Sequence, residues 1–156
     1  MGYAQDILSQ GLNQNATYDA VFAAIHKKYP FINDKNLSIL SPGERAFILT
    51  QDLSGRISVS GFDGYFLNTQ CRALHETMRS FLLIGATKDL DIIRRAVSVA
   101  RIPEPLPAGF EYFFGDEDIT EMEAALHKLD SEFYKAGNDL HHLLVEYFKK
   151  HPEEFE

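Results

Sequence analysis

The sequence predicts an all-α protein, a single globular bundle of about seven helices. Apolar residues recur at spacings of three and four along most of the chain, which is the pattern of a helix with one buried face. Helix-capping residues and helix-ending Gly and Pro residues separate these segments, and no segment has a convincing strand alternation. The length of 156 residues fits one domain over residues 1–156, with a sizeable core.

Two helices are expected before residue 30. A short one covers residues 3–10 and ends at Gly11. The second begins near Asn15 or Thr17, either of which can cap it. It stops at Pro30, because the residue before a proline is pushed out of the helical region. The expected buried face of this second helix is Tyr18, Val21, Phe22, Ile25 and Tyr29.

The third helix is expected to begin at Ser41-Pro42-Gly43-Glu44, where Ser caps, Pro suits the first turn and Glu completes a capping box. Its apolar face runs as far as Ile57, and the pattern fails at Ser60-Gly61. A short helix then covers Phe62 to Leu67, with aromatic side chains facing the core. The segment 60–68 is therefore predicted to be a Gly-Phe helix break, around which the rest of the fold is organised.

Two further helices follow the break. One is expected over about 70–84, with Gly85 as its left-handed C-terminal residue. The other is expected over about 88–101, with Thr87 as its cap. The apolar face of the first is Leu74, Met78, Phe81 and Leu82.

The last third holds an extended connector and two helices. The connector is rich in proline: Pro103, Pro105 and Pro107. Asp118 and Glu121 resemble a capping box at the start of the next helix, which breaks near Gly137-Asn138. The final helix ends at His151-Pro152.

Net charge is the strongest functional signal in the sequence. The chain carries −8, but residues 1–110 hold eleven Lys/Arg against ten Asp/Glu, whereas residues 111–156 hold four Lys against thirteen Asp/Glu. The last third therefore carries −9, which argues against direct nucleic-acid binding and favours a basic protein surface as partner. The alternative is that an acidic face serves only solubility.

A row of carboxylates in this third is the predicted partner-binding face. On a helix, side chains three or four apart lie about 5–6 Å from each other, so such a row matches nucleic-acid phosphates in sign and spacing. Helix capping and solubility are the alternative explanation. The residues of the predicted acidic face are Asp116, Glu117, Asp118, Glu121, Glu123, Asp130 and Glu132.

Catalytic chemistry and membrane insertion receive little support. The six histidines form no metal-ligand pattern, so neither a metal nor a cofactor is predicted. The single cysteine, Cys71, precludes an intrachain disulfide and favours a reducing cytoplasm. The N-terminus shows no signal-peptide pattern, and the longest apolar run, residues 81–84, is too short for a bilayer, so no membrane partner is expected.

The block Gly61-Phe62-Asp63-Gly64-Tyr65-Phe66-Leu67-Asn68 resembles the signature of the DNA-mimic-protein-19-like family, a bacterial family of small acidic helical domains. Ile84-Gly85-Ala86 and Leu129-Asp130-Ser131-Glu132-Phe133-Tyr134 resemble two further family segments, in the same order. The resemblance covers about residues 41–150. It assigns structural roles to Gly61, Phe62, Tyr65, Phe66 and Asn68.

The resemblance implies an all-helical fold and a non-enzymatic role, because the member that names the family mimics DNA on the basic face of a transcription factor. The first hypothesis is therefore an acidic domain that binds the basic surface of a DNA-binding protein. An immunity or antitoxin-like protein that neutralises a toxin is the alternative. An enzyme with a site formed by Tyr65, Asn68, Cys71 and His75 ranks last, and a homodimer is left open.

Overall fold

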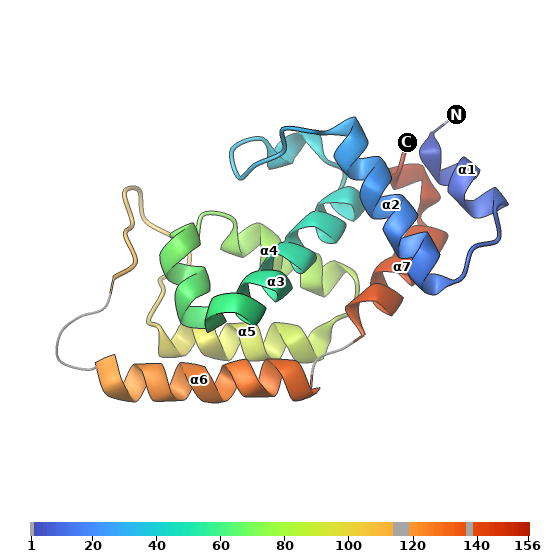
Figure 1. Cartoon of the computed structure of the whole chain (residues 1–156). Coiled ribbons are helices and arrows are strands. Elements are labelled where there is room, and N and C mark those ends of the chain that lie inside the picture. The colour runs from blue at the N-terminus through green and yellow to red at the C-terminus, as the bar shows by residue number, and fades with distance from the viewer. Residues whose placement is uncertain (1, 114–118, 137–138) are drawn as a thin grey trace.

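The helix α3 runs through the middle of the molecule, and the other helices pack around it (Figure 1). The computed structural model describes residues 2–113, 119–136 and 139–156. Within these ranges the chain forms seven α-helices and no strand, which confirms the all-α prediction. They are α1 (Tyr3–Ser9), α2 (Gln14–Lys28), α3 (Pro42–Thr69), α4 (Leu74–Leu83), α5 (Thr87–Val99), α6 (Ile119–Ala136) and α7 (Leu140–Lys150), with short 3-10 helices at Leu37–Ile39 and Pro152–Glu154.

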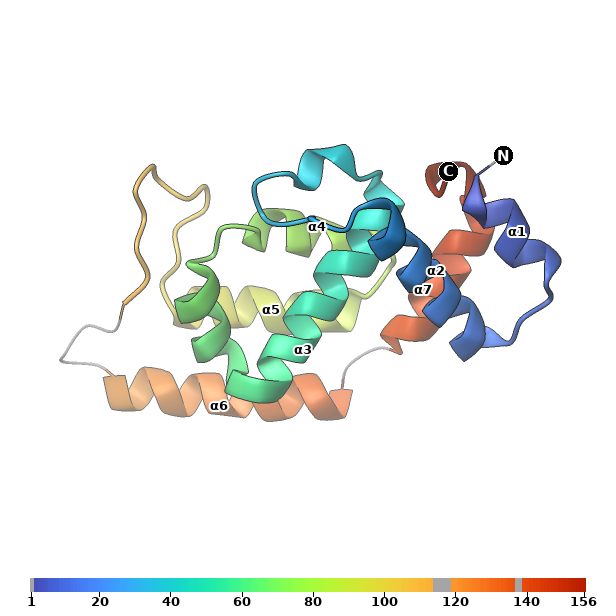
Figure 2. The same cartoon turned by 45° about the horizontal axis from the view of Figure 1, so that its top comes forward.

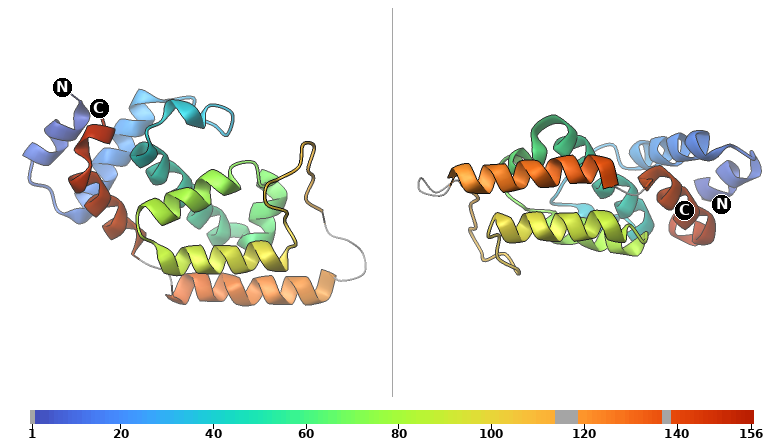
Figure 3. Two further views of the ribbon diagram at one scale, coloured as in Figure 1. Left: turned by 180° about the vertical axis from the view of Figure 1, so that it is seen from behind. Right: turned by 90° about the horizontal axis from the view of Figure 1, so that it is seen from below.

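The helices form two groups joined by α3 into one globular arrangement. The first group, α1, α2 and α7, lies at one end, where the two chain termini are neighbours (Figures 1 and 2). The second group, α4, α5 and α6, lies at the other end, and α6 runs antiparallel along α5 (Figure 3). None of the described helices is long and apolar enough to cross a membrane.

The predicted break in α3 is present. Gly61 has φ 69° and ψ 179°, so the helix axis changes direction there. Behind it Phe62, Tyr65 and Phe66 are buried, as the sequence predicts. The ring of Phe62 packs edge-on against Phe133 of α6, with 5.7 Å between ring centroids. The break therefore brings the aromatic end of α3 against α6.

The helix starts are only partly as predicted. The capping box at Ser41 and Glu44 is confirmed. The prediction for α2 was wrong, because its cap is Asn13, whose side chain accepts the Ala16 N–H at 3.0 Å. The hydroxyl of Thr17 instead donates to the Asn13 carbonyl, at 2.8 Å. Asn13 can cap because it has the extended backbone that the position before a helix requires.

The region between α3 and α5 needs three corrections. Residues 70–73 form a turn rather than the start of a helix, because Gln70 and Cys71 both have left-handed φ angles. The predicted core residue Leu82 is 57% exposed. Thr87 is not a cap, because α5 begins after Ala86 without a side-chain cap. The prediction for Gly85 is confirmed by its φ of +77°.

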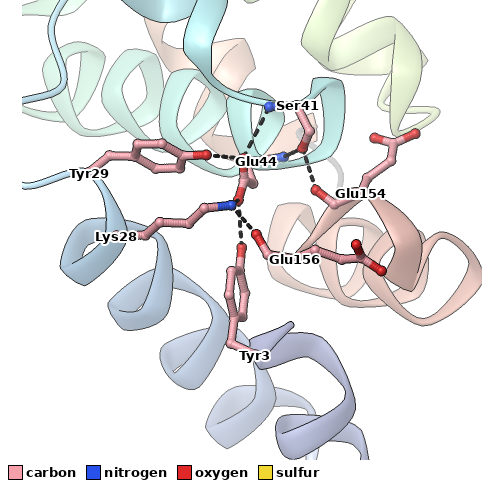
Figure 4. A network of polar contacts seen from close by, with 7 residues as sticks. All are labelled: Tyr3, Lys28, Tyr29, Ser41, Glu44, Glu154 and Glu156. Carbon is pink, nitrogen blue, oxygen red and sulfur yellow. Dashed lines mark hydrogen bonds and ion pairs between the residues drawn. The ribbon is translucent and has the colours of Figure 1, made fainter. Parts of the chain in front are cut away.

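A buried carboxylate joins the first group of helices to the start of α3 (Figure 4). Glu44 is 1% exposed, and its Oε1 accepts hydrogen bonds from Lys28 Nζ and from the Tyr3 hydroxyl, both at 3.1 Å. Its Oε2 accepts from the Ser41 N–H at 3.1 Å and from the Tyr29 hydroxyl at 3.3 Å. A buried charge is costly unless it is paired and hydrogen-bonded, and these four donors meet that requirement.

The C-terminal residues complete this network. Lys28 donates to the backbone carbonyl of Glu156, and the Ser41 hydroxyl donates to the carbonyl of Glu154. The Glu154 carboxylate accepts the Gly43 N–H at 2.7 Å. Burial alone would lower the pKa of Lys28, but its contacts with Tyr29 and Glu44 outweigh burial and raise it. The start of α3 is thus bound to both ends of the chain.

Candidate protein-binding surface

The apolar residues of α6 determine where its carboxylates lie. Leu126, Leu129 and Phe133 are buried against the rest of the fold, and α6 contacts both α5 and α3. Side chains on either side of this stripe therefore lie beside α5 or beside α3. Four residues of the predicted acidic face, Glu121, Glu123, Asp130 and Glu132, lie on α6, whereas Asp116, Glu117 and Asp118 lie outside the described residues.

The flank of α6 beside α5 carries Glu121 and Glu132. Glu132 forms an ion pair with Arg95, whose Nη1 lies 2.9 Å from Glu132 Oε2, and Arg95 also contacts Asp91. Hydrogen bonding to Arg95 lowers the pKa of Glu132. A shallow groove between α5 and α6 is lined by Arg95, Glu121 and Glu132. Glu121 has no ion-pair partner among the described residues.

The flank beside α3 carries Asp130, which serves the fold directly. Its Oδ1 accepts the backbone N–H of Phe62 at 2.8 Å, and its side chain is only 15% exposed. The Phe62 N–H follows the break at Gly61, so Asp130 caps the second half of α3 from a different helix. His127 Nδ1 lies 3.5 Å from Asp130 Oδ2.

Asp63 is a member of this acidic surface that the sequence analysis did not select. Its Oδ1 accepts a hydrogen bond from the Tyr112 hydroxyl at 3.4 Å. Burial raises the pKa of Asp63, the Tyr112 hydrogen bond opposes this, and the charges of Glu123 and Asp130 raise it further. The sequence feature that could have identified Asp63 is its position two residues after the predicted break, since acidic side chains are common at the start of a helical segment.

The described carboxylates of α6 therefore lie on two flanks of the helix, and on each flank one of them has a partner within the chain. Glu132 and Asp130 have partners within the chain, on opposite flanks of α6. Glu121 and Glu123 have no hydrogen-bond or ion-pair partner among the residues that the structure describes, so they are the members available to a basic surface.

The residues of the enzyme hypothesis are not brought together. Tyr65 and Asn68 line a cavity between α3 and the loop after α2, but Cys71 and His75 do not. Cys71 is fully buried, and burial raises its pKa to about 11, the opposite of an activated thiolate. His75 is exposed on α4.

One group of three metal-ligand side chains lies within the described residues. His151, Glu153 and Glu154 have donor atoms within 4.8 Å of one another. Both carboxylate oxygens of Glu154 already accept hydrogen bonds, from the Gly43 N–H and from the Tyr147 hydroxyl. We therefore assign Glu154 to the fold rather than to a metal.

Comparison with known proteins gives a family match that includes the break at Gly61. No match to the chain was found among curated proteins or among solved structures. The sequence model described as DMP19-like protein matches residues 38–151, which is well over half of the chain and includes both α3 and α6. The chain therefore belongs to the DMP19-like protein family.

Proposed function

We propose that this chain is a non-enzymatic protein-binding domain whose acidic C-terminal third engages the basic surface of a DNA-binding protein, as a DNA mimic does. The observation that carries the proposal is the charge distribution. Residues 111–156 hold thirteen Asp/Glu against four Lys, whereas the rest of the chain is nearly balanced. Membership of the DMP19-like family supports the proposal, because the family takes its name from a DNA mimic.

The proposed contacts are Glu121 and Glu123, the carboxylates of α6 without a partner among the described residues. Glu121 and Glu123 lie on opposite flanks of the helix, so a basic surface laid along α6 can reach both. The charge of Glu123 also acts unfavourably on Asp63, and a Lys or Arg from the partner relieves this repulsion. Glu132 contributes less, because Arg95 already neutralises it.

The proposal is tested by measuring the affinity for a partner captured from native lysate as salt is varied. We expect wild-type affinity to fall steeply with salt, because the attraction is between exposed charges. The double variant Glu121→Lys/Glu123→Lys weakens binding and flattens the salt dependence. The matched control Asp6→Lys/Asp19→Lys makes the same charge change on exposed residues of α1 and α2 and leaves binding close to wild type.

Competition with DNA identifies the kind of partner. A DNA mimic and DNA occupy the same surface, so added duplex DNA displaces the chain from its partner. Binding that is insensitive to DNA but sensitive to Glu121→Lys/Glu123→Lys points to the toxin-neutralising alternative. An affinity that changes neither with salt nor with Glu121→Lys/Glu123→Lys contradicts the proposal.

A further inference from the structure

A cavity of about 380 Å³ lies away from α6, between the end of α2, the segment before α3, α3 itself and the turn after it. Its volume is within the range of small-molecule sites, roughly 300–1,000 Å³. Its walls combine apolar side chains, among them Ile32, Leu37 and Leu49, with charged groups. Neither the acidic surface nor the network at Glu44 contributes to it.

Two Arg–Asp pairs form the charged part of the wall. Arg56 Nε lies 3.0 Å from both carboxylate oxygens of Asp52, and Arg72 Nε lies 2.6 Å from Asp34 Oδ2. Within the described chain, the terminal Nη groups of both arginines make no hydrogen bond. Each aspartate thus fixes its arginine through Nε and leaves the outer N–H groups available to a ligand.

Tyr65 lines the cavity from the same helix as the first pair. The residue is 2% exposed, lines the cavity and interacts electrostatically with both Asp52 and Arg56. Burial raises the pKa of Tyr65 to about 12, and a hydrogen bond with Thr77 of α4 holds its hydroxyl, so Tyr65 shapes the wall. Asn68, one helical turn further along α3, adds an amide to the same wall.

The charge of the wall limits the ligand. Two aspartates balance the two arginines, so the wall has no excess positive charge, and a dianion such as a phosphate monoester would leave more negative charge uncompensated than a monoanion. A monoanion can be held by the N–H groups of one guanidinium. The two oxygens of a carboxylate match the spacing of two such N–H groups. The apolar side of the cavity requires that the anion be attached to a hydrocarbon body.

We propose that this cavity binds an organic carboxylate with a small apolar body, and that Arg56, positioned by Asp52, holds the carboxylate. A carboxylate on an apolar body can belong to a free organic acid or to the C-terminal residue of a polypeptide. The pair Arg72–Asp34 joins the loop after α2 to the turn after α3 and so shapes the opposite wall.

Amide NMR titration of the whole chain tests the proposal with two pairs of probes. They are 4-methylpentanoate with its amide, and N-acetyl-leucine with N-acetyl-leucinamide. Each acid is expected to shift the backbone signals of Arg56, Tyr65 and Asn68 saturably, and each amide to bind at least about tenfold more weakly. The acid that binds more tightly identifies the source.

Variants separate this site from general anion attraction. Arg56→Gln is expected to weaken acid binding about tenfold or more, and Arg56→Lys to restore part of it. Arg79→Gln removes an exposed arginine of α4 outside the cavity and leaves binding unchanged. The NMR spectrum of each variant reports its fold. Equal binding of acid and amide, an unaffected Arg56→Gln variant, or no saturable shift with either acid overturns the proposal.

Discussion

Asp130 of α6 accepts the backbone N–H of Phe62 in α3, at 2.8 Å and across 68 residues of sequence. The acceptor lies directly after the break at Gly61, where the backbone departs from helical geometry. A carboxylate that the charge pattern predicts to face a partner thus also stabilises the middle of the fold. The acidic third and the Gly-Phe break are therefore one structural unit.

Replacing Asp130 is expected to destabilise the protein. Asp130→Ala removes the cap, which costs about 1–2 kcal/mol of the free energy of unfolding. Asp130→Asn costs less, because its amide oxygen still accepts the Phe62 N–H. Urea unfolding measures both. The control Glu123→Gln, which removes a neighbouring carboxylate without a hydrogen bond in the described chain, stays within about 0.5 kcal/mol of wild type. Equal losses for Asp130→Ala and Glu123→Gln contradict the capping role.

Two glycines of α3 are expected to respond in opposite directions to alanine. Gly61→Ala destabilises by about 1–3 kcal/mol, because its φ and ψ are accessible essentially only to glycine. The new Cβ also collides with the Asp130 carboxylate. Gly55→Ala places its Cβ in open space within a helix and stabilises by about 0.5–1 kcal/mol. Thermal or urea unfolding of both variants checks the sign, and a stable Gly61→Ala protein would disprove the strained break.

The buried Glu44 is expected to tolerate substitution poorly. Glu44→Gln weakens the hydrogen bonds from Tyr3 and Tyr29 and removes the negative charge that pairs with Lys28, at a cost of about 2–4 kcal/mol. A double-mutant cycle with Tyr29→Phe measures the coupling. Asp52→Asn breaks a half-exposed ion pair instead and is expected to cost less than about 1 kcal/mol. Similar losses in the two single variants count against a buried network.

Asp63 is expected to make stability depend on pH. Burial raises its pKa in the folded chain above the ordinary 3.8, so the folded state binds this proton more tightly than the unfolded state. By linkage, the free energy of unfolding falls as pH rises from the ordinary value through the raised one. Asp63→Asn removes this decrease in the free energy of unfolding, because asparagine carries no charge at any pH. Its amide oxygen still accepts the Tyr112 hydrogen bond.

Urea unfolding of wild type and Asp63→Asn between about pH 4 and pH 8 measures this effect. The variant is expected to be the more stable protein at neutral pH, and the difference is expected to shrink toward the acidic end. A difference that stays constant across the range, or a variant that is less stable at neutral pH, means that the Asp63 charge is not unfavourable in the fold.

Much of the fold follows from local sequence. The capping box of Ser41 and Glu44 and the left-handed Gly85 were predictable because each acts within a few residues of its own position. The break at Gly61 was predictable for the same reason. The exposure of Leu82 was not, because its spacing fits a buried face and only the packing of α4 determines which neighbours that face has.

The sequence alone determined the helical class, the helix break and the negative sign of the last third. These depend on backbone propensity and on residue counts, which need no knowledge of distant contacts. The tertiary structure decided what each carboxylate does. Asp130 caps α3, Glu132 pairs with Arg95 and Asp63 joins the acidic group, because side chains far apart in sequence meet only when α6 packs against α3 and α5.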